Sequence, residues 1–168
     1  MRESGKTLSR DALVAELARQ RAAGRSVAMA NGLFDLLHVG HLRYLEAARH
    51  EADLLVVAVN SDASARRLKG PTRPVTPERE RAELIGGFAC VDYVTIFGEE
   101  TVEPLLRALR PDVHCKGTDY TAETVPEAGV ARELGIRIAI VGDPKNHATR
   151  EILGRIQGAP ETDPERSS

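Results

Sequence analysis

The amino-acid sequence predicts an α/β domain in which helices cover both faces of a mainly parallel sheet of about five strands. Short apolar segments alternate along the chain with segments of helical periodicity, and the links between them are short. The segment 53–59 reads Asp-Leu-Leu-Val-Val-Ala-Val, a continuous apolar run that indicates a strand buried on both faces. Strands separated by helices imply right-handed βαβ crossovers, and therefore a three-layer α/β/α, Rossmann-like arrangement.

The amino-terminal third begins this alternation. Residues 9–23 carry leucines at helical spacing and are followed by Gly24, so they predict a helix that ends at this glycine. The short apolar run 26–30 predicts the first strand. Residues 41–50 return to helical spacing, and 53–59 form the buried strand.

The rest of the chain continues the pattern. The helical segments hold apolar residues three and four positions apart, and Pro126 stands near a first turn, where its missing N–H costs little. The intervening strand segments are short apolar runs. Helices are expected at 78–85, 102–109, 126–134 and 149–156, and strands at 93–97, 112–115 and 136–141.

Length and composition fit one globular domain. The chain has 168 residues, of which 42% are hydrophobic and 29% charged, and it is too short for two ordinary domains. We expect the domain to occupy residues 1–157. The polar, proline-containing segment 158–168 is expected to be a disordered tail.

Several classes of protein are disfavoured by composition. Aromatic residues make up 4% of the chain and the net charge is −2, which argues against a nucleic-acid partner. No apolar run approaches the roughly 18 residues of a membrane span, so we expect a cytoplasmic protein without a membrane partner. Cys90 and Cys115 do not suggest a disulfide framework, and the sequence predicts no protein-held metal.

Unusual residues gather in the strand-to-helix turns, where open α/β sheets bind ligands. The first turn, 31–41, reads Asn-Gly-Leu-Phe-Asp-Leu-Leu-His-Val-Gly-His. His38 and His41 stand where a loop enters a helix, and Gly40 between them lets a phosphate approach the backbone. Either histidine alone is more often a helix cap or a packed residue than a ligand, and a shared metal is a further alternative.

Three other turns add candidate residues. The turn 60–69 ends on Lys69, one of only four lysines in the chain, and mobile cations there could close over a triphosphate. The turn 116–120 offers Lys-Gly-Thr-Asp-Tyr at a strand end, although it could be an ordinary turn. The turn 142–149 ends on Thr149, which could cap the last helix or hold a phosphate.

The string NGLFDLLHVGHLRYLEAA resembles the HxGH signature of the nucleotidyltransferase superfamily. With NSDASARRLKGPTRPV, VDYVTIF and RPDVHCKGTDY, the chain is similar to the D-glycero-β-D-manno-heptose 1-phosphate adenylyltransferase domain. In many members that domain is fused to a sugar kinase, whereas this chain looks like a stand-alone transferase. The resemblance implies that His38 and His41 stabilise the nucleotide phosphates and that Lys69 contacts the triphosphate, so these three are the expected catalytic residues.

The expected reaction is transfer of a nucleoside monophosphate, AMP by preference, from an NTP to a sugar phosphate such as heptose 1-phosphate, with release of pyrophosphate. Mg²⁺ is expected to be bound through the NTP phosphates, and the superfamily suggests a homodimer. The alternatives are a CTP-dependent cytidylyltransferase acting on glycerol phosphate or a similar alcohol phosphate, and a non-catalytic nucleotide-binding module. The expected nucleotide-binding residues are Asn31, Gly32, Leu33, Phe34, Gly40, Lys116, Gly117, Asp119, Thr149 and Arg150, and the expected acceptor-binding residues are Asp35, Asn60, Asp62 and Arg73.

Overall fold

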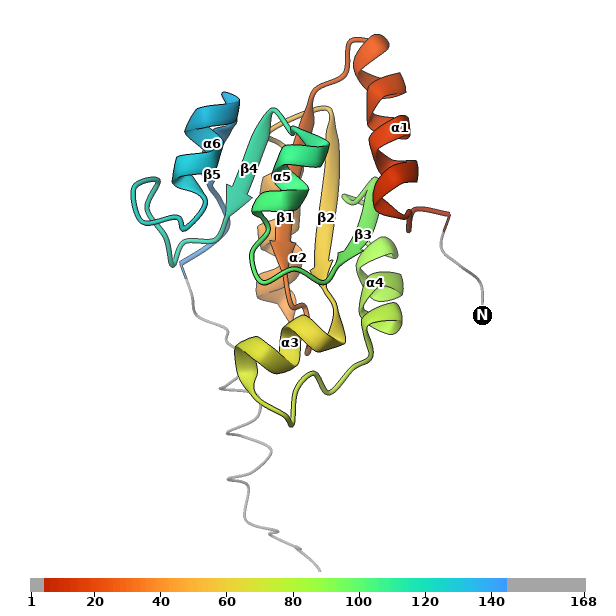
Figure 1. Cartoon of the computed structure of the whole chain (residues 1–168), viewed down its shortest axis with the longest axis vertical. Coiled ribbons are helices and arrows are strands. Elements are labelled where there is room, and N and C mark those ends of the chain that lie inside the picture. Colours follow the sequence, from red (N-terminus) through yellow and green to blue (C-terminus); the bar gives the residue numbers. More distant parts are fainter. Residues whose placement is uncertain (1–4, 145–168) are drawn as a thin grey trace, which may run out of the picture.

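One parallel sheet of five strands organises residues 5–144, the part of the chain that the computed structural model describes (Figure 1). The strands follow the spatial order β3-β2-β1-β4-β5, and every pairing between neighbours in this sheet is parallel. The predicted α/β fold with about five strands is therefore confirmed. The strands are β1 (Val27–Gly32), β2 (Leu54–Asn60), β3 (Tyr93–Phe97), β4 (Val113–Lys116) and β5 (Arg137–Ile140).

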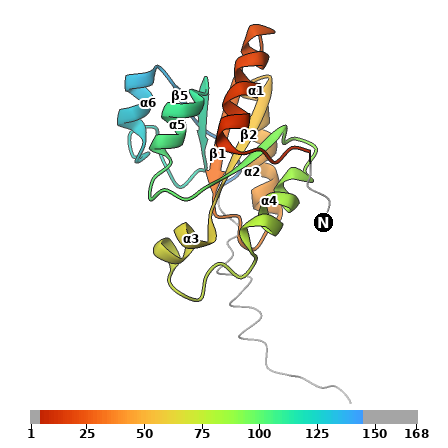
Figure 2. The same ribbon diagram turned by 45° about the vertical axis from the view of Figure 1, so that its right-hand side comes forward.

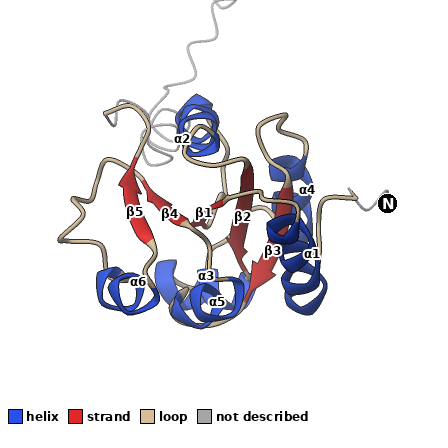
Figure 3. Ribbon diagram, turned by 90° about the horizontal axis from the view of Figure 1, so that it is seen from above, coloured by secondary structure: helices blue, strands red, loops and turns tan. Residues whose placement is uncertain are grey.

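Helices cover both faces of the sheet, as the three-layer prediction requires (Figure 3). Side chains of α2 and α4 pack on one face, and those of α1, α5 and α6 pack on the other. None of the helices within residues 5–144 is long and apolar enough to cross a membrane. The helices are α1 (Arg10–Ala22), α2 (Val39–Arg49), α3 (Asp62–Lys69), α4 (Glu78–Gly86), α5 (Glu103–Leu109) and α6 (Ala128–Leu134).

The central strands supply the core that the sequence predicted. All seven residues of β2 are buried, because β2 lies between β1 and β3 and has helices on both faces. Successive residues of β1 alternate between the two packing layers: Ala28 and Ala30 belong to the layer under α2, and Val27 and Met29 to the layer under α5. Continuous apolar runs of this kind are typical of central parallel strands.

The segment predicted as the turn 60–69 is mostly a helix, α3, which lies beyond the carboxyl end of β2 (Figure 2). Ser61 caps it by accepting a hydrogen bond from the Ser64 N–H at 3.1 Å. Gly70, with a φ of 97°, ends it. The prediction of a plain turn was wrong because good helix formers follow a capping serine here.

The strand order places a switch point between β1 and β4. From β1 the chain proceeds outward through β2 and β3, and it then returns to the other side of β1 to form β4 and β5. Ligands of open α/β sheets bind at the carboxyl ends of the strands beside such a point. The predicted helix 149–156 and tail 158–168 lie outside the described residues.

Candidate active site

The turn that follows β1 is built around a close contact between a glycine and a ring. A Cβ atom on Gly32 would lie 3.1 Å from the ring of Phe34, so any side chain there would crowd this ring. Phe34 itself adopts a left-handed conformation with φ of 51° and is buried. Its ring meets the His41 ring edge-on, with 5.5 Å between the ring centroids. The conformation of this turn therefore places the Phe34 ring against the His41 ring.

The two histidines form the amino-terminal cap of α2. His38 is the N-cap residue, and its Nδ1 atom accepts a hydrogen bond from the Gly40 N–H at 3.1 Å. The Nδ1 atom of His41 accepts from the His38 N–H at 3.3 Å. A neutral imidazole that accepts at Nδ1 carries its proton on Nε2. Both rings are thus fixed in the tautomer that offers Nε2–H as a donor, and their centroids are 4.0 Å apart.

The first turns of α2 are held against the switch point by Tyr44. Its hydroxyl donates to the carbonyl of Cys115 on β4 at 2.8 Å, and burial raises the pKa of this phenol. A Cβ on Gly142 would lie 3.3 Å from the Tyr44 Cα atom, so the chain beyond β5 passes closely over α2. These contacts link the histidine-bearing helix to the strand on the other side of the switch point.

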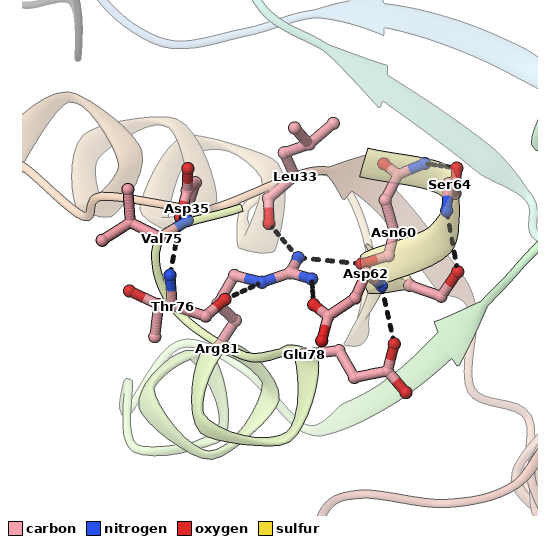
Figure 4. A network of polar contacts seen from close by, with 10 residues as sticks. Leu33, Asp35, Asn60, Asp62, Ser64, Val75, Thr76, Glu78 and Arg81 are labelled. Atoms are coloured by element: carbon pink, nitrogen blue, oxygen red, sulfur yellow. Dashed lines mark hydrogen bonds and ion pairs between the residues drawn. The ribbon is translucent and has the colours of Figure 1, made fainter. Parts of the chain in front are cut away.

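A buried arginine connects three segments around the site (Figure 4). The Arg81 side chain, on α4, is completely buried. Its guanidinium donates to the carbonyls of Leu33 at 2.5 Å, Asn60 at 2.8 Å and Thr76 at 2.8 Å, and to Oδ1 of Asp62 at 2.7 Å. The turn after β1, the start of α3 and the loop before α4 are therefore positioned relative to one another by one side chain.

Asp35 adds a second link between the first turn and the loop 70–77. This buried carboxylate accepts from the N–H groups of Val75 and Thr76 through Oδ1, at 2.8 and 3.0 Å (Figure 4). Its Oδ2 atom lies 2.9 Å from Nη1 of Arg73. Both oxygens therefore contact groups of the protein itself, an arrangement that braces the loop.

Lys69 occupies the carboxyl end of α3, beyond this braced loop. It is exposed, and among residues 5–144 it has no ion pair or hydrogen-bonding partner. Arg66 and Arg67 share the last turn, where the Arg67 guanidinium donates to the Gly98 carbonyl at 2.5 Å. An exposed ammonium at the end of this helix can move to an anionic ligand at small cost.

On the β4 side of the switch point the polar residues are buried. The Lys116 ammonium lies 3.3 Å from Oε2 of Glu127 and 5.0 Å from the centroid of the Tyr120 ring. Two residues earlier on β4, Nε2 of His114 lies 3.0 Å from Oδ1 of Asn31. Burial, with a smaller contribution from the charge of Lys116, lowers the pKa of His114 to about 3, so this imidazole is neutral near pH 7.

The loop that follows β4 is exposed. Gly117 has open space where a Cβ would stand, and the neighbouring Thr118 donates from its hydroxyl to the Asp143 carbonyl at 3.0 Å. Asp119 is exposed. In the part of the chain that the structure describes, no group of three or more His, Cys, Asp or Glu side chains is arranged to hold a metal ion.

Comparison with known families decides the classification. The model of the family described as cytidylyltransferase-like matches residues 29–157, which include both histidines and the segments described above from Met29 in β1 onward. The chain belongs to the cytidylyltransferase-like family. The predicted superfamily and enzyme class, a nucleotidyltransferase, are thereby confirmed.

Curated relatives are similar to this cytidylyltransferase-like chain along most of its length. It is 46% identical over 147 residues to the bifunctional protein HldE of Syntrophotalea carbinolica and 43% identical over 148 residues to that of Hyphomonas neptunium, covering 88% of this chain in each case. The chain spans about 30% of the length of these relatives. A solved structure, the lipopolysaccharide core biosynthesis protein from Thermoplasma volcanium, superposes with a TM-score of 0.62 at 28% identity, covering 73% of this chain and all of that one.

The structure brings many of the predicted site residues to the carboxyl edge of the sheet, in two groups around β1. Lys69, Arg73, Asn60 and Asp62 lie on the β2 side, and the Lys116 loop lies on the β4 side. The predicted acceptor-binding residues form hydrogen bonds or ion pairs with other residues of the protein; they are Asp35, Asn60, Asp62 and Arg73. Their contact with an acceptor stays a prediction. Thr149 and Arg150 lie outside the described residues.

Sequence reasoning in this family member missed Arg81, His114 and Glu127. His114 and Glu127 stand beside apolar residues, whereas Arg81 stands among charged ones, and each becomes significant only through contacts with other segments. A signal for Arg81 was present, because it stands four residues before Ile85 on the face of α4 that is buried. An arginine at such a position requires several acceptors, since burying its charge is costly otherwise.

Proposed function

We propose that this chain is an adenylyltransferase that transfers AMP from ATP to a sugar phosphate such as heptose 1-phosphate and releases pyrophosphate. The observation that carries the proposal is the histidine pair at the start of α2, where both Nδ1 atoms accept backbone N–H groups, so that each neutral ring carries its proton on Nε2. The similarity to HldE proteins and to a lipopolysaccharide core biosynthesis protein supports a sugar-phosphate acceptor.

In the proposed reaction an oxygen of the acceptor phosphate attacks the α-phosphorus of ATP in line with the leaving group. The bond from that phosphorus to the oxygen bridging the α- and β-phosphates breaks, and pyrophosphate leaves with the bonding electrons. An acceptor phosphate is already ionised near neutral pH. The protein therefore needs no nucleophile of its own, and its contribution is positioning and electrostatic stabilisation.

Three elements of the site supply that stabilisation in this proposal. The Nε2–H groups of His38 and His41 donate to phosphate oxygens, and the amino terminus of α2 adds a favourable dipole. Lys69 reaches the β- and γ-phosphates from the end of α3. Mg²⁺ enters bound to the triphosphate as part of the substrate and offsets its negative charge.

The proposal is tested by measuring pyrophosphate release with ATP, CTP, GTP and UTP, each against heptose 1-phosphate, other sugar 1-phosphates and glycerol phosphate. Products are identified by mass spectrometry. We expect the highest kcat/KM for ATP with a sugar 1-phosphate. A preference for CTP with an alcohol phosphate would assign the chain to the cytidylyltransferases proper, and no release with any pair would indicate a nucleotide-binding module.

We also propose a homodimer, an expectation that comes from the superfamily resemblance, and a cytoplasmic location, which was expected because the sequence has no apolar run of membrane-spanning length. Sedimentation velocity of the full chain measures the oligomeric state directly. A mass near 18.2 kDa at micromolar concentration would contradict the dimer.

A further inference from the structure

A histidine of β4 stands inside the apolar layer that α5 and α6 cover. Val113 and Cys115 belong to the layer under α2, so the side chain of His114 between them projects into the opposite layer. His114 is completely buried. Its Nδ1 atom is enclosed and has no hydrogen-bonding partner in the described part of the chain. An unpaired buried polar atom costs stability, so packing alone does not explain a histidine at this position.

The other ring nitrogen of His114 contacts Asn31 on the neighbouring strand β1. Its Nε2 atom lies 3.0 Å from Oδ1 of Asn31. An amide oxygen can only accept, so in this neutral imidazole the proton is on Nε2. With the Asn31 amide reversed, the proton would be on Nδ1, and an N–H group would be enclosed without an acceptor. The observed orientation leaves only a lone pair unpartnered.

Asn31 lies where the strand enters the histidine turn. It is the next-to-last residue of β1, directly before Gly32, and it is only partly buried. The oxygen and the nitrogen of a carboxamide point in different directions, so the Nδ2 group is directed away from His114. Within residues 5–144, Nδ2 donates no hydrogen bond. The contact with His114 therefore leaves both donors of the amide for a ligand.

We propose that His114 is a positioning residue for nucleotidyl transfer, and that it holds the Asn31 amide with its NH₂ group as a donor to a phosphate oxygen of a bound substrate. That phosphate belongs either to the nucleotide or to the acceptor. An amide without this restraint can rotate and present its oxygen, which repels a phosphate. A donor that is already oriented stabilises an anion without reorganisation. This inference rests on the proposed function, since it concerns the same site.

The test compares His114→Leu with His114→Gln in the full chain. Leucine removes the donor and fills the apolar layer, whereas glutamine carries an N–H group as many bonds from the backbone as Nε2. We expect kcat/KM to fall about three- to tenfold in His114→Leu and to be mostly recovered in His114→Gln. His114→Leu should melt at or above the wild-type temperature, because the unpartnered Nδ1 atom is removed too. The separate KM values for ATP and for the sugar 1-phosphate show which phosphate Asn31 contacts.

A double-mutant cycle separates positioning from a general effect on the fold. Because His114 acts through Asn31, adding His114→Leu to Asn31→Ala should lower kcat/KM no further. The matched control is Thr95→Val on β3, which removes another enclosed polar atom without a partner in the described part of the chain. We expect Thr95→Val to leave kcat/KM unchanged.

NMR of the wild-type chain tests the geometry without any substitution. Long-range coupling between the ring protons and the ring nitrogens of His114 identifies the protonated nitrogen, which we expect to be Nε2. A proton on Nδ1 would overturn the inference. So would wild-type kcat/KM in His114→Leu, additive losses in the cycle, or an equal loss in Thr95→Val.

Failure of the proposed function gives a different result, namely no pyrophosphate release by the wild-type chain from any substrate pair. Calorimetric titration with ATP and with the sugar 1-phosphate then replaces kcat/KM as the measurement. A three- to tenfold weaker affinity of His114→Leu for one of these ligands would support the positioning role. Unchanged affinity for both would overturn it.

Discussion

The Nδ1 atom of His41 accepts the backbone N–H of His38, and the Nδ1 atom of His38 in turn accepts the N–H of Gly40. The helix cap and the proposed catalytic pair are therefore one structure. Capping satisfies amide groups that the first turn of a helix would leave unpaired, and it also determines which nitrogen of each ring bears the proton. Structural and functional interpretations of these histidines, which the sequence left as alternatives, are compatible.

We expect His41→Ala to lower kcat by about 10²–10³-fold or more, because one preorganised donor to the transition-state phosphate is lost. Pyrophosphate release at saturating substrate measures this. The matched control is His50→Ala, which removes an exposed imidazole at the other end of α2. Near-full activity in His41→Ala, with a melting temperature close to that of the wild type, would contradict the proposed role of the pair.

Lys69→Ala should reduce kcat/KM for the nucleotide by about tenfold or more, since a mobile cation no longer reaches the triphosphate. Stability should change by less than about 0.5 kcal/mol, because the side chain is exposed. Arg79→Ala removes an exposed cation from α4 and serves as the charge-matched control. Equal losses in both variants would indicate a general electrostatic effect instead of a contact by Lys69.

Replacing Arg81 by Met should destabilise the domain by about 3–5 kcal/mol, because Asp62 and three backbone carbonyls lose their donor. Arg81→Lys should recover only part of this loss, since a single ammonium cannot reproduce the four-bond geometry of a guanidinium. Urea unfolding monitored by circular dichroism gives both values. Full stability in Arg81→Met would show that the network in Figure 4 contributes little.

Acid should destabilise the protein through His114 before most carboxylates titrate. Its pKa is about 3 in the folded protein and 6.5 for the reference group, so only the unfolded chain binds a proton between these values. Stability is therefore present above pH 6.5 and falls as the pH decreases, by about 2 kcal/mol from this group at pH 5.

His114→Gln supplies the comparison for this pH dependence, because it removes the titrating ring. The difference in unfolding free energy between pH 7 and pH 5 should be smaller in the variant than in the wild type. An identical pH dependence in the two proteins would mean that His114 does not stay neutral in the folded state.

The sequence alone was sufficient for most of the helices and strands and for the motif-bearing turn. Leucines at helical spacing and the apolar run of β2 report local periodicity and burial, which do not depend on knowing the partner segments. The helix α3 was missed, although Ser61 and Gly70 mark its two ends, because its short basic sequence resembles a loop. The histidine turn was recognisable because all of its parts lie within eleven consecutive residues.

Only the tertiary structure decided how separate turns are joined. Arg81 contacts Leu33 across 48 residues of sequence, and Lys116 meets Glu127 only because α6 returns to the end of β4. Such pairs form where the parallel sheet brings the carboxyl ends of distant strands to one edge. Residue identity and spacing fixed the chemistry of the first turn, whereas the buried polar contacts that position it arise from packing, which local sequence does not encode.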